Sequence, residues 1–229
     1  MRSMKRALFY FVVALFTVSC AGMSLFSGAK GEFDAGLTLF NRGVYDQAVP
    51  HFLKATELDP EFDQAYLYLG RSYLSLGRWG DAVQPLRTAY RLAPAETQKE
   101  IGSILFDALL STAVGDLKKG EFLPAIEHLR EGLALNPSSP QAKNELAGAF
   151  VGYGGALLRD GRVTDAISAF QQALGVAPGS LDAYLGLAKA FMSQGEPVKA
   201  KEAADSAIRI APGKSRTLND MLERIGTPR

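Results

Sequence analysis

The sequence predicts an all-α solenoid, built from five antiparallel helix pairs and a C-terminal capping helix. A Gly…Ala…Pro motif with offsets of 5 and 12 residues recurs five times along the 229-residue chain. Two of the four steps between successive copies are 34 residues long, and the other two are 43 and 41. Within each copy, apolar residues return every three or four positions, which is the spacing of one helix face. Since one pair cannot bury its apolar face alone, we expect the stacked pairs to fold together.

The composition fits a globular protein and argues against several classes of function. Apolar residues make up 47% of the chain and charged residues 21%, which is ordinary for a globular domain. The 25 Lys and Arg residues against 24 Asp and Glu leave a net charge of +1, whereas nucleic-acid-binding domains are usually strongly basic. One Cys and two His cannot supply the four ligands of a structural zinc site. We therefore expect no metal, no other cofactor and no nucleic-acid partner.

The first segment of the chain, residues 1–19, is typical of a bacterial export signal. Arg2, Lys5 and Arg6 precede an uncharged apolar run, and small residues follow it. Residues 17–20 resemble the lipobox of bacterial lipoproteins, which implies cleavage before Cys20 and a lipid on that residue. The resemblance also implies an outer-membrane protein facing the periplasm, because the residue after the Cys is not Asp.

Two alternatives to the lipid anchor remain open from the sequence. The uncharged run extends from residue 7 to residue 29, and about 20 apolar residues can span a bilayer. An uncleaved helix would then anchor the protein in the inner membrane. Cleavage after Ala21 would instead release it. In each case the rest of the chain would lie outside the cytoplasm. With the lipid anchor, we expect residues 20–31 to form a tether or linker ahead of a repeat domain that covers residues 32–229.

The five copies of the motif define the elements of the repeat domain. Aligned on the Ala, the repeats are expected at residues 29–62, 63–96, 106–139, 147–180 and 181–214. In the second copy, Gly70 and Tyr73 lie on the first helix, Ala82 on the second, and Pro94 after it. This pattern resembles the tetratricopeptide repeat, whose unit is a pair of antiparallel helices, A and B. The small residue at position 8 allows close approach of the helices, and the Gly at position 15 ends helix A. The Pro at position 32 ends helix B.

Two inserts, residues 97–105 and 140–146, account for the longer steps between copies. The first insert keeps the apolar rhythm of a helix. In the second, Pro140 suits the first turn of a helix, with Ser139 as its N-cap. We expect both inserts to lengthen helix A at its N-terminal end. The alternative is two longer loops.

A last helix is expected at residues 215–226, after the fifth repeat. Leu218, Met221, Leu222 and Ile225 are spaced i, i+3, i+4, i+7, which places them on one helix face. Such a helix would cap the apolar face of the last repeat.

The sequence offers no constellation that could catalyse a reaction. His51 and His128 occupy the same position of two different repeats, so they are expected at the surface or the edge of a groove. Cys20 lies far from both in the sequence, which argues against a Cys–His pair. The glycine cluster at residues 152–155 falls within a helix A, where small residues serve packing. We expect no enzyme and no catalytic residue.

The resemblance implies a binding surface on the concave face, lined by helix-A positions 2, 5, 9, 12 and 13. All ten residues at positions 5 and 12 are apolar, and cations are sparse. The residues expected to line a partner-binding groove are Phe33, Leu37, Phe40, Leu67, Arg71, Leu74, Leu110, Val114, Leu117, Val151, Leu158, Leu185, Lys189 and Met192. The alternative is a tight superhelix in which these side chains bury one another.

An apolar groove with few cations suits an amphipathic helix or an extended apolar peptide of a protein partner. The chain resembles tetratricopeptide lipoproteins of the bacterial envelope, which implies a membrane-tethered adaptor that assists assembly of an envelope machine. The alternative function is a structural spacer or a self-oligomerising scaffold without a groove ligand.

Overall fold

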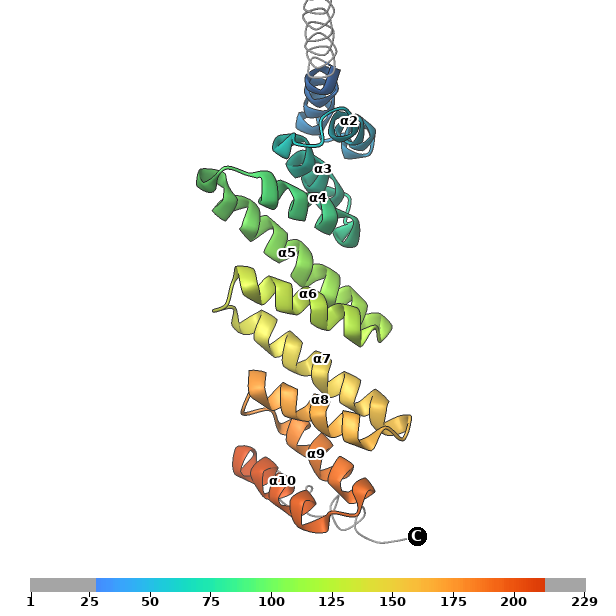
Figure 1. Cartoon of the computed structure of the whole chain (residues 1–229), viewed down its shortest axis with the longest axis vertical. Helices are drawn as coiled ribbons and strands as arrows, with labels where there is room; N and C mark the ends of the chain where they lie inside the picture. Colours follow the sequence, from blue (N-terminus) through green and yellow to red (C-terminus); the bar gives the residue numbers. More distant parts are fainter. Residues whose placement is uncertain (1–27, 213–229) are drawn as a thin grey trace, which may run out of the picture. The chain divides into compact units, whose positions relative to one another are not determined.

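The computed structural model describes residues 28–212, in which the regular structure is entirely helical (Figure 1). The all-α fold class is thereby confirmed. The expected export signal at residues 1–19, the lipidation site Cys20 and the capping helix at residues 215–226 lie outside the described residues. No helix within residues 28–212 combines the length and the apolarity that crossing a membrane requires.

The helices follow one another along the chain with only short turns between them. After a helical segment over residues 28–41, they are α2 (Tyr45–Leu58), α3 (Asp63–Ser75), α4 (Trp79–Leu92), α5 (Ala95–Lys119), α6 (Phe122–Leu135), α7 (Pro140–Arg159), α8 (Val163–Val176), α9 (Leu181–Gln194) and α10 (Pro197–Ile210). Successive helices form the expected packed pairs of a solenoid (Figure 1).

The chain divides into two compact units, residues 1–108 and 109–229, with the boundary inside α5. In the first unit, α3 packs against both α2 and α4. In the second unit, each helix from α6 to α10 packs against the next. There α7 also contacts α9, so the first helices of two successive pairs touch each other.

The five predicted turn glycines have the left-handed conformation that favours glycine. Their φ angles lie between 70° and 80° at Gly43, Gly77, Gly120, Gly161 and Gly195. A side chain at such a φ would clash with the backbone, and the glycines therefore end the first helix of each pair without strain.

The two helices of a pair approach closely where position 8 carries a glycine, as expected. A Cβ atom on Gly70 would lie 2.5 Å from Cγ of Leu86. A Cβ atom on Gly154 would lie 2.8 Å from the ring of Phe170. Larger residues at these two glycines would therefore push the helices of a pair apart.

Both inserts lengthen a helix, and the alternative of two loops is wrong. The first lies within α5, which has 25 residues, and the second within α7, which has 20. Oγ of Ser139 accepts a hydrogen bond from the backbone N–H of Ala142 at 3.2 Å, so Ser139 is the predicted N-cap of α7. Ile101 is 2% exposed and packs against the end of α4.

The helix of the first repeat begins earlier than the expected boundary of the tether. Residues 28–31, assigned to the tether from the sequence, are helical. Ala29 is 1% exposed and lies one helical turn before the buried Phe33. Because this turn carries a buried apolar residue, it belongs to the repeat domain.

Candidate functional site

The residues expected to line the groove differ in how far they are buried. Phe33 and Leu110 are buried, with exposures of 6% and 9%, and Lys189 is exposed. Half-buried are Leu37, Phe40, Leu67, Arg71, Leu74, Val114, Leu117, Val151, Leu158, Leu185 and Met192. The predicted groove residues therefore do not form one uniformly exposed surface.

Phe33 belongs to the core of the first unit and not to a groove. Its ring centroid lies 5.7 Å from that of Phe52, 4.9 Å from that of Phe62 and 5.6 Å from that of Tyr68. Phe40 stacks edge-on against the same Tyr68 at 5.1 Å. The assignment of Phe33 to the groove is thus corrected, because aromatic neighbours fill the space around it.

Arg71, the expected groove cation of the first unit, is already paired. One of its guanidinium nitrogens donates to Oε1 of Glu100 at 2.7 Å, and the guanidinium lies 5.6 Å from the ring centroid of Tyr68. The side chain therefore bridges α3 and α5 and is held in place by contacts within the chain.

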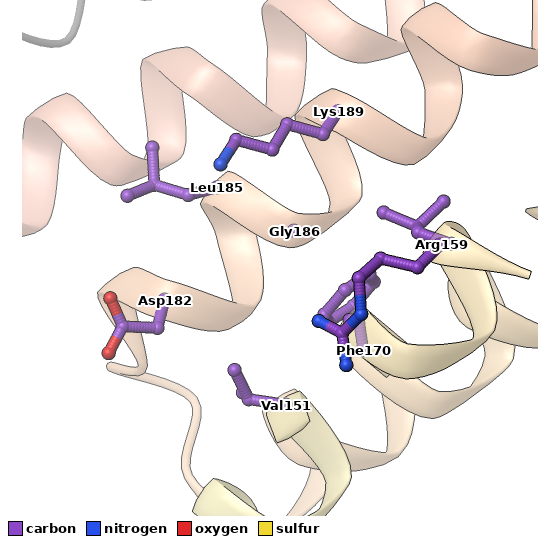
Figure 2. A pocket seen from close by; sticks show the side chains of 9 residues that line it. Val151, Arg159, Phe170, Asp182, Leu185, Gly186 and Lys189 are labelled. Carbon is purple, nitrogen blue, oxygen red and sulfur yellow. The ribbon is translucent and has the colours of Figure 1, made fainter. Parts of the chain in front are cut away.

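The second unit contains an open cavity of about 470 Å³ between α7 and α9 (Figure 2). It is lined by Val151, Gly155, Leu158 and Arg159 of α7, Phe170 of α8, and Asp182, Leu185, Gly186 and Lys189 of α9. Four of the expected groove residues are thereby brought together, namely Val151, Leu158, Leu185 and Lys189. A volume of this size lies within the range of ligand-binding clefts.

The floor of this cavity is an aromatic ring held between two helices. Phe170 is 2% exposed. Its ring lies against the backbones of both Gly154 and Gly186, at the edge formed by Cδ1, Cε1 and Cζ. Because Gly154 and Gly186 lack side chains, the Phe170 ring of α8 can pack against both α7 and α9.

A second hollow of about 680 Å³ adjoins the first along α7. It is lined by Asn144, Ala147, Gly148, Val151 and Gly152, and by the turn over residues 177–180 with Asp182. Val151 and Asp182 line both hollows. We call the two together the α7–α9 furrow.

The cavity carries charged side chains at its edges. Arg159 ends α7, Asp182 lies in the first turn of α9, and Lys189 lies near the middle of α9. Within residues 28–212, none of these three forms an ion pair or a side-chain hydrogen bond. All three are exposed, so their charges are available to a ligand.

The neighbouring Arg162, by contrast, is engaged. Its Nε donates to Oδ2 of Asp165 at 2.8 Å. This hydrogen bond and the charge of Asp165 raise the pKa of the Arg162 guanidinium above its usual value. Arg159 is thus the arginine at this end of α7 that faces the cavity without a carboxylate partner of its own.

Five lining residues of the cavity were not in the predicted groove, namely Gly155, Arg159, Phe170, Asp182 and Gly186. Asp182 and Arg159 occupy positions 2 and 13 of their repeats. Both positions belong to the set expected on the concave face, so their place in the repeat is enough to predict them. Phe170 comes from the second helix of its pair, and a search along first helices alone could not have found it.

The two histidines each pair with an acid of their own helix pair. Nδ1 of His51 lies 2.7 Å from Oε2 of Glu32, and both side chains are more than a third exposed. Nδ1 of His128 lies 3.0 Å from Oδ2 of Asp116, whose side chain is only 10% exposed. Neither histidine lines the furrow. Residues 28–212 contain no group of three side chains placed to hold a metal ion.

Comparison with protein families identifies the repeat. Two tetratricopeptide repeat profiles match residues 33–97 and 157–219, together more than half of the chain. The chain belongs to the tetratricopeptide repeat family. In this tetratricopeptide repeat protein, the second matched range contains Phe170, Asp182 and Lys189, and so most of the cavity wall.

Curated relatives share only part of their length with this tetratricopeptide repeat protein. The mitochondrial ALBINO3-like protein 3 of Arabidopsis thaliana is 27% identical over 139 residues, which is 59% of this chain and 25% of that protein. The tetratricopeptide repeat-containing protein YpiA of Bacillus subtilis is 28% identical over 118 residues, or 52% of this chain and 26% of that protein. The chain thus spans about a quarter of the length of each relative.

Solved structures of tetratricopeptide repeat proteins are similar over much of the chain. MamA is 23% identical, covers 82% of this chain and 94% of its own, and gives a TM-score of 0.39. YrrB, described as having an unusual peptide-binding site, is 21% identical with coverages of 84% and 90% and a TM-score of 0.36.

Proposed function

We propose that this tetratricopeptide repeat protein is a protein-interaction scaffold that holds an extended segment of a partner protein in the α7–α9 furrow. The observation that carries the proposal is the cavity of about 470 Å³, in which side chains of two successive repeats face each other. Its walls are apolar at Val151, Leu158 and Leu185, and charged side chains lie at its edges. Peptide-recognition grooves combine these two features.

The size of the cavity favours an extended segment over a helix. A helix with its side chains is about 10–12 Å wide, and it would have to lie on top of the furrow instead of entering it. Gly155 and Gly186 line the cavity between α7 and α9 without adding side chains to it. A few side chains of an extended segment can enter that space and bury apolar surface there.

Selection of peptides from a random library tests this proposal. A phage-displayed library of random 12-residue peptides is panned on the full chain in mild detergent. The double variant Leu158→Glu, Leu185→Glu places two charges in the apolar walls and should lose the enriched peptides. The matched control Leu53→Glu changes an exposed leucine of α2 and should retain them. If no peptide is enriched over the double variant, the furrow is not a peptide site and the spacer or self-association alternative takes its place.

We also propose that the scaffold is tethered to a bacterial envelope membrane through a lipid on Cys20 and assists assembly there. The support is the sequence alone, since residues 1–27 lie outside the described part. The Cys20→Ala variant should lose lipid labelling and, after processing, leave the outer membrane. Unchanged membrane association with no processing in either form would favour an uncleaved inner-membrane helix instead.

A further inference from the structure

The α7–α9 furrow has opposite charges at the two ends of its apolar middle. In Figure 2, Val151 lies between Asp182 and Arg159 in the view of the cavity. Neither charged group is compensated by an ion pair within residues 28–212. Arg78 and Arg162, each just before a helix, are by contrast paired with Asp81 and Asp165.

The negative end is Asp182 in the first turn of α9. Ser180, not Asp182, accepts the capping hydrogen bond of this helix, from the backbone N–H of Ala183. The carboxylate of Asp182 is therefore not used as a cap. It lines both hollows of the furrow, where it can accept hydrogen bonds from a cationic side chain.

The positive end is Arg159 in the last turn of α7. Its guanidinium folds back over the preceding turn, with Nη1 3.9 Å from the place that a Cβ atom of Gly155 would take. The guanidinium therefore lies against the backbone of Gly155 at the cavity wall. Lys189 adds a second cation from α9, and a guanidinium can grip a carboxylate by two hydrogen bonds.

The distance between the two ends sets a spacing in the ligand. On α9, Asp182 precedes the cation Lys189 by seven residues. Seven residues of helix rise about 10.5 Å. An extended chain advances about 3.3 Å per residue, so this length corresponds to three or four residues.

We infer that the segment bound in the furrow carries a basic and an acidic residue three or four positions apart, with an apolar residue between them. The basic side chain pairs with Asp182, the apolar one contacts Val151, Leu158 or Leu185, and the carboxylate pairs with Arg159 and Lys189. The inference rests on the proposed function, because it names the chemistry of the peptide that the furrow holds. The two charged ends also fix the direction of the bound segment.

Charge-reversal variants of the full chain test this inference with the same 12-residue library. Peptides enriched on the wild-type protein should show the basic–apolar–acidic order. On the variant Arg159→Glu, Lys189→Glu, the enriched peptides should carry a base where the acid was. On Asp182→Lys, an acid should replace the base. The matched control Lys201→Glu, an exposed cation of α10 outside the furrow, should select the wild-type pattern.

Affinities of one synthetic peptide give the second readout. The peptide most enriched on the wild-type protein should bind Arg159→Glu, Lys189→Glu more than about tenfold less tightly, since two exposed attractions of up to about 1 kcal/mol each become repulsions. It should bind Lys201→Glu within about twofold of the wild type. Restored binding by a peptide with the matching charge reversal would support the pairing directly.

Two results would overturn the inference and are distinguishable from failure of the proposed function. If peptides are enriched and lost on Leu158→Glu, Leu185→Glu, but show no charge pattern, the furrow binds peptides by apolar contact alone. If the pattern exists but does not respond to the charge reversals, other groups recognise the charges. If nothing is enriched on any variant, the proposed function itself fails, and the inference fails with it.

Discussion

The ring of Phe170 on α8 lies so close to the backbone of Gly186 on α9 that a Cβ atom there would overlap ring carbons. A Cβ atom on Gly154 would lie 2.8 Å from the same ring. The ring is 2% exposed and forms the floor of the α7–α9 furrow (Figure 2). Two glycines of successive repeats therefore fix the depth of the cavity.

Substitution of Gly186 by Ala should destabilise the second unit. The added methyl group would overlap a buried ring that also contacts Gly154, and overpacking of this kind costs about 1–3 kcal/mol. We expect a lower midpoint of urea unfolding, followed by far-ultraviolet circular dichroism. The same variant should bind a furrow peptide more weakly, because the displaced ring enters the cavity.

The matched control is Gly175→Ala, also in a helix of the second unit. A Cβ atom on Gly175 would have no neighbour within 4 Å. Alanine is favoured over glycine in a helix by up to about 1 kcal/mol, so this variant should be neutral or more stable. Equal destabilisation by both variants would show that the ring contact is not the cause.

Asp116 lies at position 11, where the other repeats carry an apolar or aromatic residue. It is 7% exposed, and Nδ1 of His128 lies 3.0 Å from its Oδ2. The variant His128→Ala should cost about 1–3 kcal/mol, because it leaves a buried carboxylate without this partner. In an Asp116→Leu background the same change should cost less than about 0.5 kcal/mol. Urea unfolding of the four proteins gives the coupling energy.

The pair of His51 and Glu32 is the matched control for this cycle. Their side chains are 38% and 37% exposed, and exposed ion pairs contribute at most about 1 kcal/mol. We therefore expect His51→Ala to cost less than His128→Ala at the same pH. A larger loss of stability in His51→Ala than in His128→Ala would contradict the claim that the buried Asp116 depends on His128.

Ser139 should stabilise the start of α7, which forms one wall of the furrow. Its Oγ accepts the backbone N–H of Ala142 at 3.2 Å. Loss of this N-cap in Ser139→Ala should cost about 1 kcal/mol and speed hydrogen exchange in the first turn of α7. Ser139→Asp should retain the stability, and Ser138→Ala, next to it but exposed, should change little. If the amide hydrogens in the first turn of α7 exchange as slowly in Ser139→Ala as in the wild type, Ser139 does not have this role.

The sequence predicted the helix pairs well because their boundaries depend on local chemistry. Gly77 at positive φ and Ser139 at an N-cap act within a few residues of themselves, so their position in the chain is sufficient evidence. The lengthening of α5 and α7 followed for the same reason, since the inserts keep helical spacing and a start signal.

The binding surface could be predicted only in part, because exposure depends on residues distant in the sequence. Leu158 and Leu185 belong to different repeats and line one cavity, as their shared register indicated. Phe33 occupies the same register position as Leu185, yet it is buried by Phe52 and Phe62. The position of a residue within its repeat does not by itself show whether neighbouring side chains bury it.

The most direct test of the central claim is a photo-crosslinking measurement on the furrow. The photoreactive amino acid p-benzoylphenylalanine replaces Leu185 in one full-length variant, and exposed Leu53 of α2 in another. Each is irradiated with the biotinylated peptide most enriched on the wild-type protein, and the adducts are mapped by mass spectrometry. We expect an adduct at position 185 that excess unlabelled peptide removes, and none at position 53. Binding that persists without an adduct at 185, or an equal adduct at 53, would contradict a peptide site between α7 and α9.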